Sequence, residues 1–270
     1  ITGFKNNASY ARLWEARQIW GAIINGSRAW ALLVADFIPD DAPARQRLLH
    51  RHIAWVTALR FQLREPRPWE NMQRQANIEY RKKYPIDEWQ AKIEDTLTLL
   101  LSPAECQSVL ARKSRAILLL TLQGRDLRQL HANGAITELQ HIELERTLVA
   151  FINAQGRSER IKNFPYPRQF ATLNLLFTWT FIVLVPFGLL PEFHKMGPHF
   201  AWAVIPASMV LAWIFHTMDK IGTSSENPFE GGPNDVPITA MSRTIEIDLR
   251  QALGETEIPP ALEPHNNILM

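Results

Sequence analysis

The 270-residue sequence lacks the usual ingredients of disulfide-stabilised, metal-binding and nucleic-acid-binding proteins. Its single cysteine, Cys106, excludes an intrachain disulfide and any metal site built from several cysteines. The 29 Lys and Arg residues are balanced by 27 Asp and Glu residues, which leaves a net charge of +2. Nucleic-acid binders usually concentrate basic charge on one face, so we expect no nucleic-acid partner.

Recognisable catalytic motifs are also missing. The stretch His141-Ile142-Glu143 is similar to half of a zinc deaminase signature, but the paired cysteines of that signature are absent. The sequence contains no His-Glu-x-x-His, no Walker loop, no Gly-x-Gly-x-x-Gly and no Gly-x-Ser-x-Gly. We therefore expect no catalytic residues, no resident metal and no cofactor. A membrane-anchored enzyme whose site is assembled from scattered residues stays open as an alternative.

Signals for β-strands are nearly absent, because apolar and polar residues do not alternate over any sustained stretch. Helical spacing of apolar residues predicts an all-α protein. The proline-containing stretch 39–43 is predicted to end the first helix, the polar stretch 64–84 to be a long loop, and Asn133-Gly134 to be a helix C-cap. The predicted helices cover residues 1–38, 44–63, 93–101, 104–123 and 136–152.

Two long apolar segments dominate the second half of the chain. Phe170–Leu190 has 21 residues and no charge, enough helix to cross roughly 30 Å of hydrocarbon at about 1.5 Å per residue. Phe200–Phe215 is shorter and reaches a marginal spanning length when it continues to Met218. Residues 191–199 form the predicted turn between them. A buried hairpin in a soluble core is the alternative, but soluble core helices seldom run this far without a charge. We predict a transmembrane helical hairpin.

The charges that flank this hairpin predict its orientation. Arg157, Arg160, Lys162 and Arg168 precede the first segment and are opposed by Glu159, whereas the turn carries one Lys and one Glu. The positive-inside rule therefore places the turn outside and both long flanking regions in the cytosol.

Three separated motifs carry a family resemblance. The first is Gly3–Arg17 (GFKNNASYARLWEAR), the second is Phe164–Pro167 (FPYP), and the third is Glu226–Gly231 (ENPFEG) followed by Asn234–Ile238 (NDVPI). In this order, with the hairpin between the last two, they resemble the bestrophins and their bacterial homologues.

The resemblance implies a multi-helix membrane protein with a large cytosolic helical region, acting as a subunit of a homopentameric ion channel in a bilayer. It implies a multi-pass protein of the bacterial inner membrane with both long flanks in the cytosol. The expected divisions are the neck helix and its continuation at 1–38, a cytosolic helical region at 39–168, the hairpin at 169–218 and a C-terminal cytosolic segment at 219–270.

The neck of the family is built from three apolar residues spaced four apart, of which only Phe4 lies within this sequence. The other two, and the first membrane helix, would precede Ile1, so we expect the beginning of the chain to be missing. A ring of Phe side chains offers ions no hydrogen bonds and gates by dewetting. The cytosolic aperture aligns with Leu139. The alternatives are that Phe4 packs on a neighbouring helix or lipid, and that Leu139 is an ordinary core residue.

Polar residues follow Phe4 on the same helix and are the expected lining of a water-filled vestibule. They are Lys5, Asn6, Asn7 and Ser9. Monovalent ions are the expected permeants, with anions slightly favoured if Lys5 faces the lumen. A non-conducting scaffold and a coupled transporter are alternatives; a transporter would be favoured by intramembrane charges, and the predicted spans contain none.

Calcium binding is not expected, although calcium-gated bestrophins carry an acidic run near their Asn-Pro-Phe element. Calcium needs six to eight oxygen ligands. The corresponding run from Glu230 to Asp235 contains two carboxylates and two glycines. We expect this segment, with Asn227 and Asp235 as its candidate regulatory or clasp residues, to turn the chain after the last span and to tie subunits together.

Overall fold

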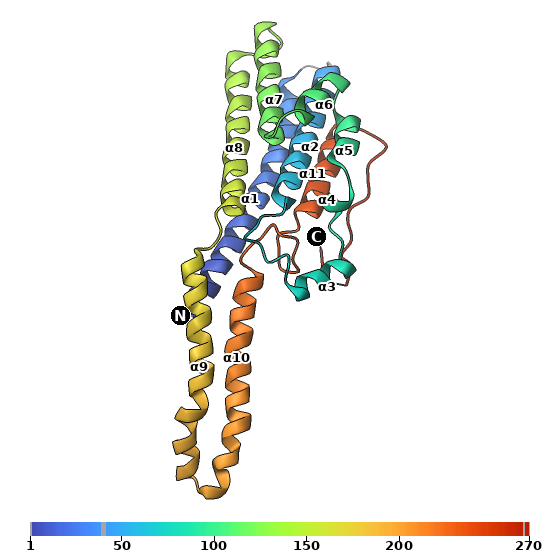
Figure 1. Ribbon diagram of the computed structural model, residues 1–270. Helices are drawn as coiled ribbons and strands as arrows, with labels where there is room; N and C mark the ends of the chain where they lie inside the picture. The colour runs from blue at the N-terminus through green and yellow to red at the C-terminus, as the bar shows by residue number, and fades with distance from the viewer. Residues whose placement is uncertain (1, 39–41, 267, 270) are drawn as a thin grey trace.

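The computed structural model describes residues 2–38, 42–266 and 268–269 (Figure 1). Regular structure in these residues is helical apart from an isolated antiparallel bridge between His265 and Ile268, which confirms the all-α prediction. The predicted break at 39–43 lies partly outside the described residues. The helices are α1 (Thr2–Phe37), α2 (Ala42–Arg64), α3 (Gln75–Lys83), α4 (Asp87–Gln90), α5 (Ile93–Leu100), α6 (Pro103–Leu110), α7 (Arg115–Ala132), α8 (Glu138–Asn163), α9 (Arg168–Lys195), the 3₁₀ helix η1 (Pro198–Ala203), α10 (Val204–Ser224) and α11 (Ile238–Ala252).

The upper part of the molecule in Figure 1 is a helical body in which α1, α2, α7, α8 and α11 run side by side. An aromatic cluster lies in the core of this body. The His52 ring lies 4.6 Å from Phe151 and 5.0 Å from Trp55, and Ser27 Oγ lies 2.8 Å from His52 Nε2. Burial lowers the pKa of His52 to about 3, so the imidazole is neutral in the core. Gly26 admits this packing, because a Cβ there would lie 2.8 Å from the Phe151 ring.

Two helix predictions in the body are wrong in detail. The predicted helix 104–123 is two helices, α6 and α7, separated by residues 111–114. The short turn preserves the apolar spacing, so the pattern does not show it. The predicted loop 64–84 contains α3, which buries none of its residues and therefore lacks an apolar face that the sequence could reveal. The predicted C-cap at Asn133 is confirmed, with Gly134 at φ 74°.

Helices α9 and α10 form a hairpin that projects away from the body (Figure 1). Its predicted turn is partly wrong, because α9 continues through Pro191 to Lys195 and the chain reverses around Gly197 at φ 124°. In α9 the buried residues are Asn174, Thr178 and Val185, whereas apolar side chains such as Phe187, 71% exposed, point outward.

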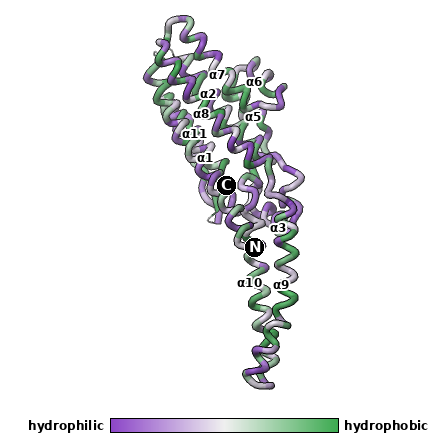
Figure 2. Tube along the Cα trace, turned by 90° about the vertical axis from the view of Figure 1, so that its left-hand side faces the viewer, coloured by the Kyte–Doolittle hydropathy of each residue, from purple (hydrophilic) through white to green (hydrophobic). Residues whose placement is uncertain are grey.

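This distribution of polar and apolar side chains is the reverse of that in a water-soluble helix pair, and Figure 2 shows the apolar colouring along both helices. Among the described residues, the stretches 168–195 and 198–224 are long and apolar enough to cross a membrane. The hairpin is not enclosed by the described residues, so the soluble-core alternative does not hold.

Gly222 of α10 lies against Lys5 and Asn6 of α1. A side chain added there would overlap the side chain of Asn6, and Lys5 Cγ lies 3.6 Å from the Cβ position. We predict that Gly222→Leu separates α1 from α10 and lowers the stability of the protein by roughly 1–3 kcal/mol, the usual cost of overpacking. The measurement is thermal unfolding in detergent. The matched control is Gly188→Leu in α9, where no described atom lies within 4 Å of the added Cβ. Equal destabilisation by both variants would contradict the prediction.

Candidate functional site

The first turns of α1 present an uncovered face. Phe4 is 80% exposed, and Asn7, Tyr10 and Trp14 are exposed at successive turns on the same side. No described residue of the chain packs over this face. Further along α1 the exposed positions include the uncharged Gln18, Ala22, Asn25 and Ala29 and the charged Arg17 and Arg28. Within residues 2–38, 42–266 and 268–269, Phe4 therefore does not pack on a neighbouring helix.

The four vestibule candidates do not lie on one face. Asn7 is exposed and Asn6 is partly buried, but Lys5 and Ser9 are buried. The prediction that Lys5 and Ser9 face a lumen is therefore wrong. Positions 5 and 9 are one helical turn apart and face the interior of the subunit.

Lys5 ends in a buried charge network at the base of the hairpin. Its Nζ lies 3.1 Å from Asp219 Oδ1 and donates to Thr223 Oγ1 at 2.6 Å. Asn174 Nδ2 donates to the same Asp219 oxygen at 2.9 Å. The Lys5 and Asp219 side chains are only 6% and 8% exposed. One carboxylate thus connects α1, α9 and α10.

This network places a buried charge just past the predicted end of the second span. Helix α10 does not end near Met218 but continues through Asp219 and Lys220 to Ser224. The apolar run stops before these residues, so hydropathy alone places the end of the helix too early. A buried charge needs a partner and hydrogen bonds, and Asp219 has both.

Arg12 makes a second connection that the sequence did not reveal. Its guanidinium donates to the carbonyl oxygens of Ile161 and Phe164, both at 2.8 Å, and of Glu226 at 3.1 Å. The first two carbonyls close the C-terminal end of α8, where a helix has acceptors without intrahelical partners. Arg12 therefore holds α1 against the segment that precedes α9 and the segment that follows α10.

Leu139 lies in the first turn of α8, at the end of the body far from the hairpin (Figure 1). It is 80% exposed, so it is not an ordinary core residue of its subunit. Thr137 begins the helix with a capping box, in which its hydroxyl accepts from Gln140 N and the Gln140 side chain accepts from Thr137 N. With 26 residues in α8, the two ends of this helix are about 39 Å apart.

The segment after α10 turns the chain towards α11. Its acidic side chains accept hydrogen bonds from other residues of the same segment. Asp235 Oδ2 accepts from Gly231 N at 2.6 Å and from Gly232 N at 3.0 Å, and it lies 3.6 Å from Arg64 Nη1. Asn227 Nδ2 donates to Glu230 Oε2 at 3.1 Å. Across residues 2–38, 42–266 and 268–269, no three His, Cys, Asp or Glu residues are placed to hold a metal.

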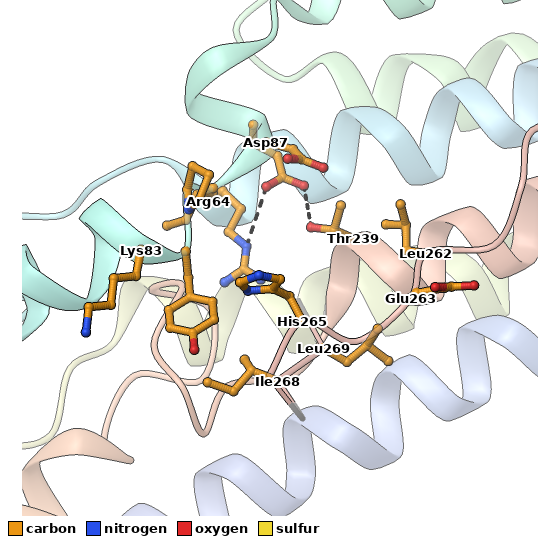
Figure 3. A pocket seen from close by; sticks show the side chains of 13 residues that line it. Arg64, Lys83, Asp87, Thr239, Leu262, Glu263, His265, Ile268 and Leu269 are labelled. Carbon is orange, nitrogen blue, oxygen red and sulfur yellow. Dashed lines mark hydrogen bonds and ion pairs between the residues drawn. The ribbon is translucent and has the colours of Figure 1, made fainter.

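Arg64 also connects this segment to α4 and α11. Glu88 Oε2 lies 3.8 Å from Arg64 Nε, and Thr239 Oγ1 donates to Glu88 Oε1 at 2.7 Å (Figure 3). A cavity of 320 Å³ opens beside Arg64 and is closed on one side by tail residues such as His265 and Ile268. These contacts explain the fold of the segment and do not reach the exposed face of α1.

Comparison with known proteins identifies related chains. A family model described as "Bacterial/Fungal Bestrophin protein" matches residues 1–251. The chain is 30% identical to the voltage-dependent anion channel-forming protein YneE of Escherichia coli K12, over 97% of this chain and 75% of that protein. It is 26% identical to the similarly named protein RSc3414 of Ralstonia nicotianae, over 95% and 74%. Its fold is similar to the crystal structure of a bacterial bestrophin homologue from Klebsiella pneumoniae, with a TM-score of 0.77, 24% identity, and 95% and 83% of the two chains covered.

Glu230 makes the stability of this region depend on pH. Burial raises the pKa of its carboxyl from 4.5 to about 7; Glu70 and Asp235 act in the same direction, and the hydrogen bond from Asn227 and the charge of Lys162 oppose it. The folded protein therefore keeps a proton that the unfolded chain releases near pH 4.5. Stability contributed by this proton falls as pH rises from about 4.5 to 7.

We predict that Glu230→Gln stabilises the protein at pH 8 by roughly 2 kcal/mol, allowing for partial exposure of the carboxyl, and has little effect at pH 5. Melting temperatures in detergent at the two pH values measure this difference. Glu192→Gln is the control, since Glu192 is an exposed residue paired with Lys195 near the hairpin turn. A Glu230→Gln effect that is the same at both pH values would contradict the prediction.

Proposed function

The chain belongs to the bacterial and fungal bestrophin family, and on this premise we propose that it is a subunit of a homopentameric channel that conducts monovalent ions passively, with anions favoured. The observation that carries the proposal is the uncovered face of α1 headed by Phe4. An aromatic residue that the described residues leave exposed, on a helix otherwise packed against α2, α8, α9, α10 and α11, would be covered by lipid or by further copies of the chain.

Five copies of Phe4 around a common axis form the neck of the proposed channel. Such a ring supplies no hydrogen bonds, so an ion passes when the ring is wide enough to stay wet. Asn7 and the small uncharged residues further along α1 line the wider part of the path. Leu139 forms the second constriction at the cytosolic exit, at the opposite end of α8.

The hairpin crosses the bacterial inner membrane in this proposal, with its turn outside and both flanks in the cytosol. Basic residues at the end of α8 and the start of α9 support this orientation under the positive-inside rule. The chain divides accordingly into a neck helix with its continuation (1–38), a cytosolic region (39–168), the hairpin (169–218) and a C-terminal cytosolic segment (219–270). We propose that the segment containing Asn227 and Asp235 also contributes to contacts between subunits.

Anion preference needs a different source from the one predicted. The charge of Lys5 is neutralised by Asp219 and does not face a lumen. The preference is supported instead by the names of the relatives, which are anion channel-forming proteins. A scaffold without conduction would use the same fold, but it gives no role to an exposed Phe4. The channel-named relatives likewise favour a channel over a membrane-anchored enzyme.

The neck assignment is tested by Phe4→Ala in the full-length protein, reconstituted in vesicles. We predict a several-fold increase in anion flux, because removal of the aromatic ring widens and wets the neck. The matched control is Phe187→Ala, which removes a ring that is 71% exposed from the outer surface of α9. If Phe4→Ala leaves flux at the wild-type level, Phe4 does not line the path.

The assignment of Leu139 to the cytosolic exit leads to a separate prediction about selectivity among anions. Leu139→Ala should widen the cytosolic aperture and raise the permeability of large anions relative to chloride. Reversal potentials under bi-ionic conditions measure this ratio. Leu99→Ala, at another exposed leucine of the body, serves as the control. An unchanged ratio for Leu139→Ala would remove Leu139 from the exit.

A further inference from the structure

We propose that the Lys5–Asp219 ion pair is a positioning element that holds Phe4 in the narrow neck and thereby sets the open probability of the channel. This inference rests on the proposed function, because it assigns a mechanical role to the residue beside the neck. Lys5 and Asp219 are positioning residues and do not contact the ion.

The geometry links the pair directly to the neck. Phe4 and Lys5 are consecutive on α1, yet Phe4 is exposed and Lys5 is buried. Adjacent residues of a helix project about 100° apart, so the helix turns one side chain outward and the other towards the hairpin. Rotation or tilt of α1 that moves Phe4 must also move Lys5 relative to Asp219.

The Lys5–Asp219 ion pair is costly to break because both side chains are buried. Asp219 accepts from Lys5 and Asn174, and Lys5 also donates to Thr223, whose hydroxyl in turn donates to the Asp219 carbonyl oxygen at 2.9 Å. Removal of one charged partner would leave the other charge buried and unpaired, which is much less favourable than the intact pair. The arrangement of α1 seen here is therefore strongly preferred while both charges are present.

The surroundings of the pair also contain polar atoms that make no hydrogen bond in this arrangement. Asn6 Oδ1, Ser9 Oγ and Asn174 Oδ1 are buried near it and have no hydrogen-bond partner among the described residues. Buried polar atoms normally find partners. In the proposal, these atoms are the acceptors that could form new hydrogen bonds when α1 shifts along the hairpin.

A second ion pair of α1 provides the contrast. Arg28 Nε lies 2.7 Å from Asp248 Oδ2 of α11, but the two side chains are 54% and 27% exposed. Water and salt screen such a pair, and it lies nearly seven helical turns beyond Phe4, so it should contribute little to the neck.

The test is single-channel recording of the full-length protein in planar bilayers. Lys5→Met and Asp219→Asn should each raise open probability several-fold without changing the conductance of the open channel. The double variant should also raise open probability, because it removes the same interaction without leaving an unpaired buried charge. The exchange of Lys5→Asp with Asp219→Lys should restore open probability towards wild type. Arg28→Met, which removes the exposed pair, is the matched control and should behave as wild type.

Combination with Phe4→Ala separates positioning from general destabilisation. If the pair acts through Phe4, Lys5→Met has no further effect on flux in the Phe4→Ala background. Damage to folding would instead lower the number of active channels without raising open probability. If Lys5→Met alone does not assemble, the double variant, which leaves no lone buried charge, carries the test.

The two proposals fail in different ways. Unchanged open probability in the assembled Lys5 and Asp219 variants, with flux still raised by Phe4→Ala, overturns the positioning role and leaves the channel proposal intact. Unchanged flux in Phe4→Ala overturns the neck assignment itself.

Discussion

One buried ion pair, between Lys5 and Asp219, joins two parts of the molecule that need opposite surroundings. The hairpin turns its apolar side chains outward and its few polar ones inward, so it needs hydrocarbon around it. The body has a conventional apolar core and a charged surface, so it needs water. Apolar packing cannot satisfy both parts at their boundary, and polar contacts of Lys5 and Arg12 hold them together there.

Helix α1 meets three environments along its length, which explains its irregular sequence pattern. Its 36 residues extend about 54 Å. One face carries Ala16, Ile19 and Trp20 into the core of the body, a second carries Lys5 towards the hairpin, and a third remains uncovered around Phe4. A helix with a single buried stripe would show clear amphipathic spacing. Here the apolar positions drift around the helix, because different neighbours cover different stretches.

The sequence predicted the features that depend on local composition. The uncharged run from Phe170 is a helix long and apolar enough to cross a membrane, and Asn133-Gly134 ends a helix by backbone geometry alone. The direction of Lys5 could not be predicted in this way. A lysine side chain normally faces water unless the fold supplies a buried carboxylate to pair with it. For Lys5 that carboxylate is Asp219, which lies 214 positions away in the sequence. Asp219 was missed for the related reason that hydropathy falls where the apolar run ends, although the helix continues.

The same connections constrain how the proposed neck and exit relate to each other. Arg12 ties α1, two turns beyond Phe4, to the C-terminal carbonyls of α8. The opposite end of α8 carries Leu139, and between these ends α1 and α8 pack closely enough that Gly26 has no room for a side chain against Phe151. Close-packed helices transmit displacement because they have little free volume in which to absorb it. A shift of α1 that moved Phe4 would therefore displace the helix that carries Leu139, so the proposed neck and the proposed exit would respond together.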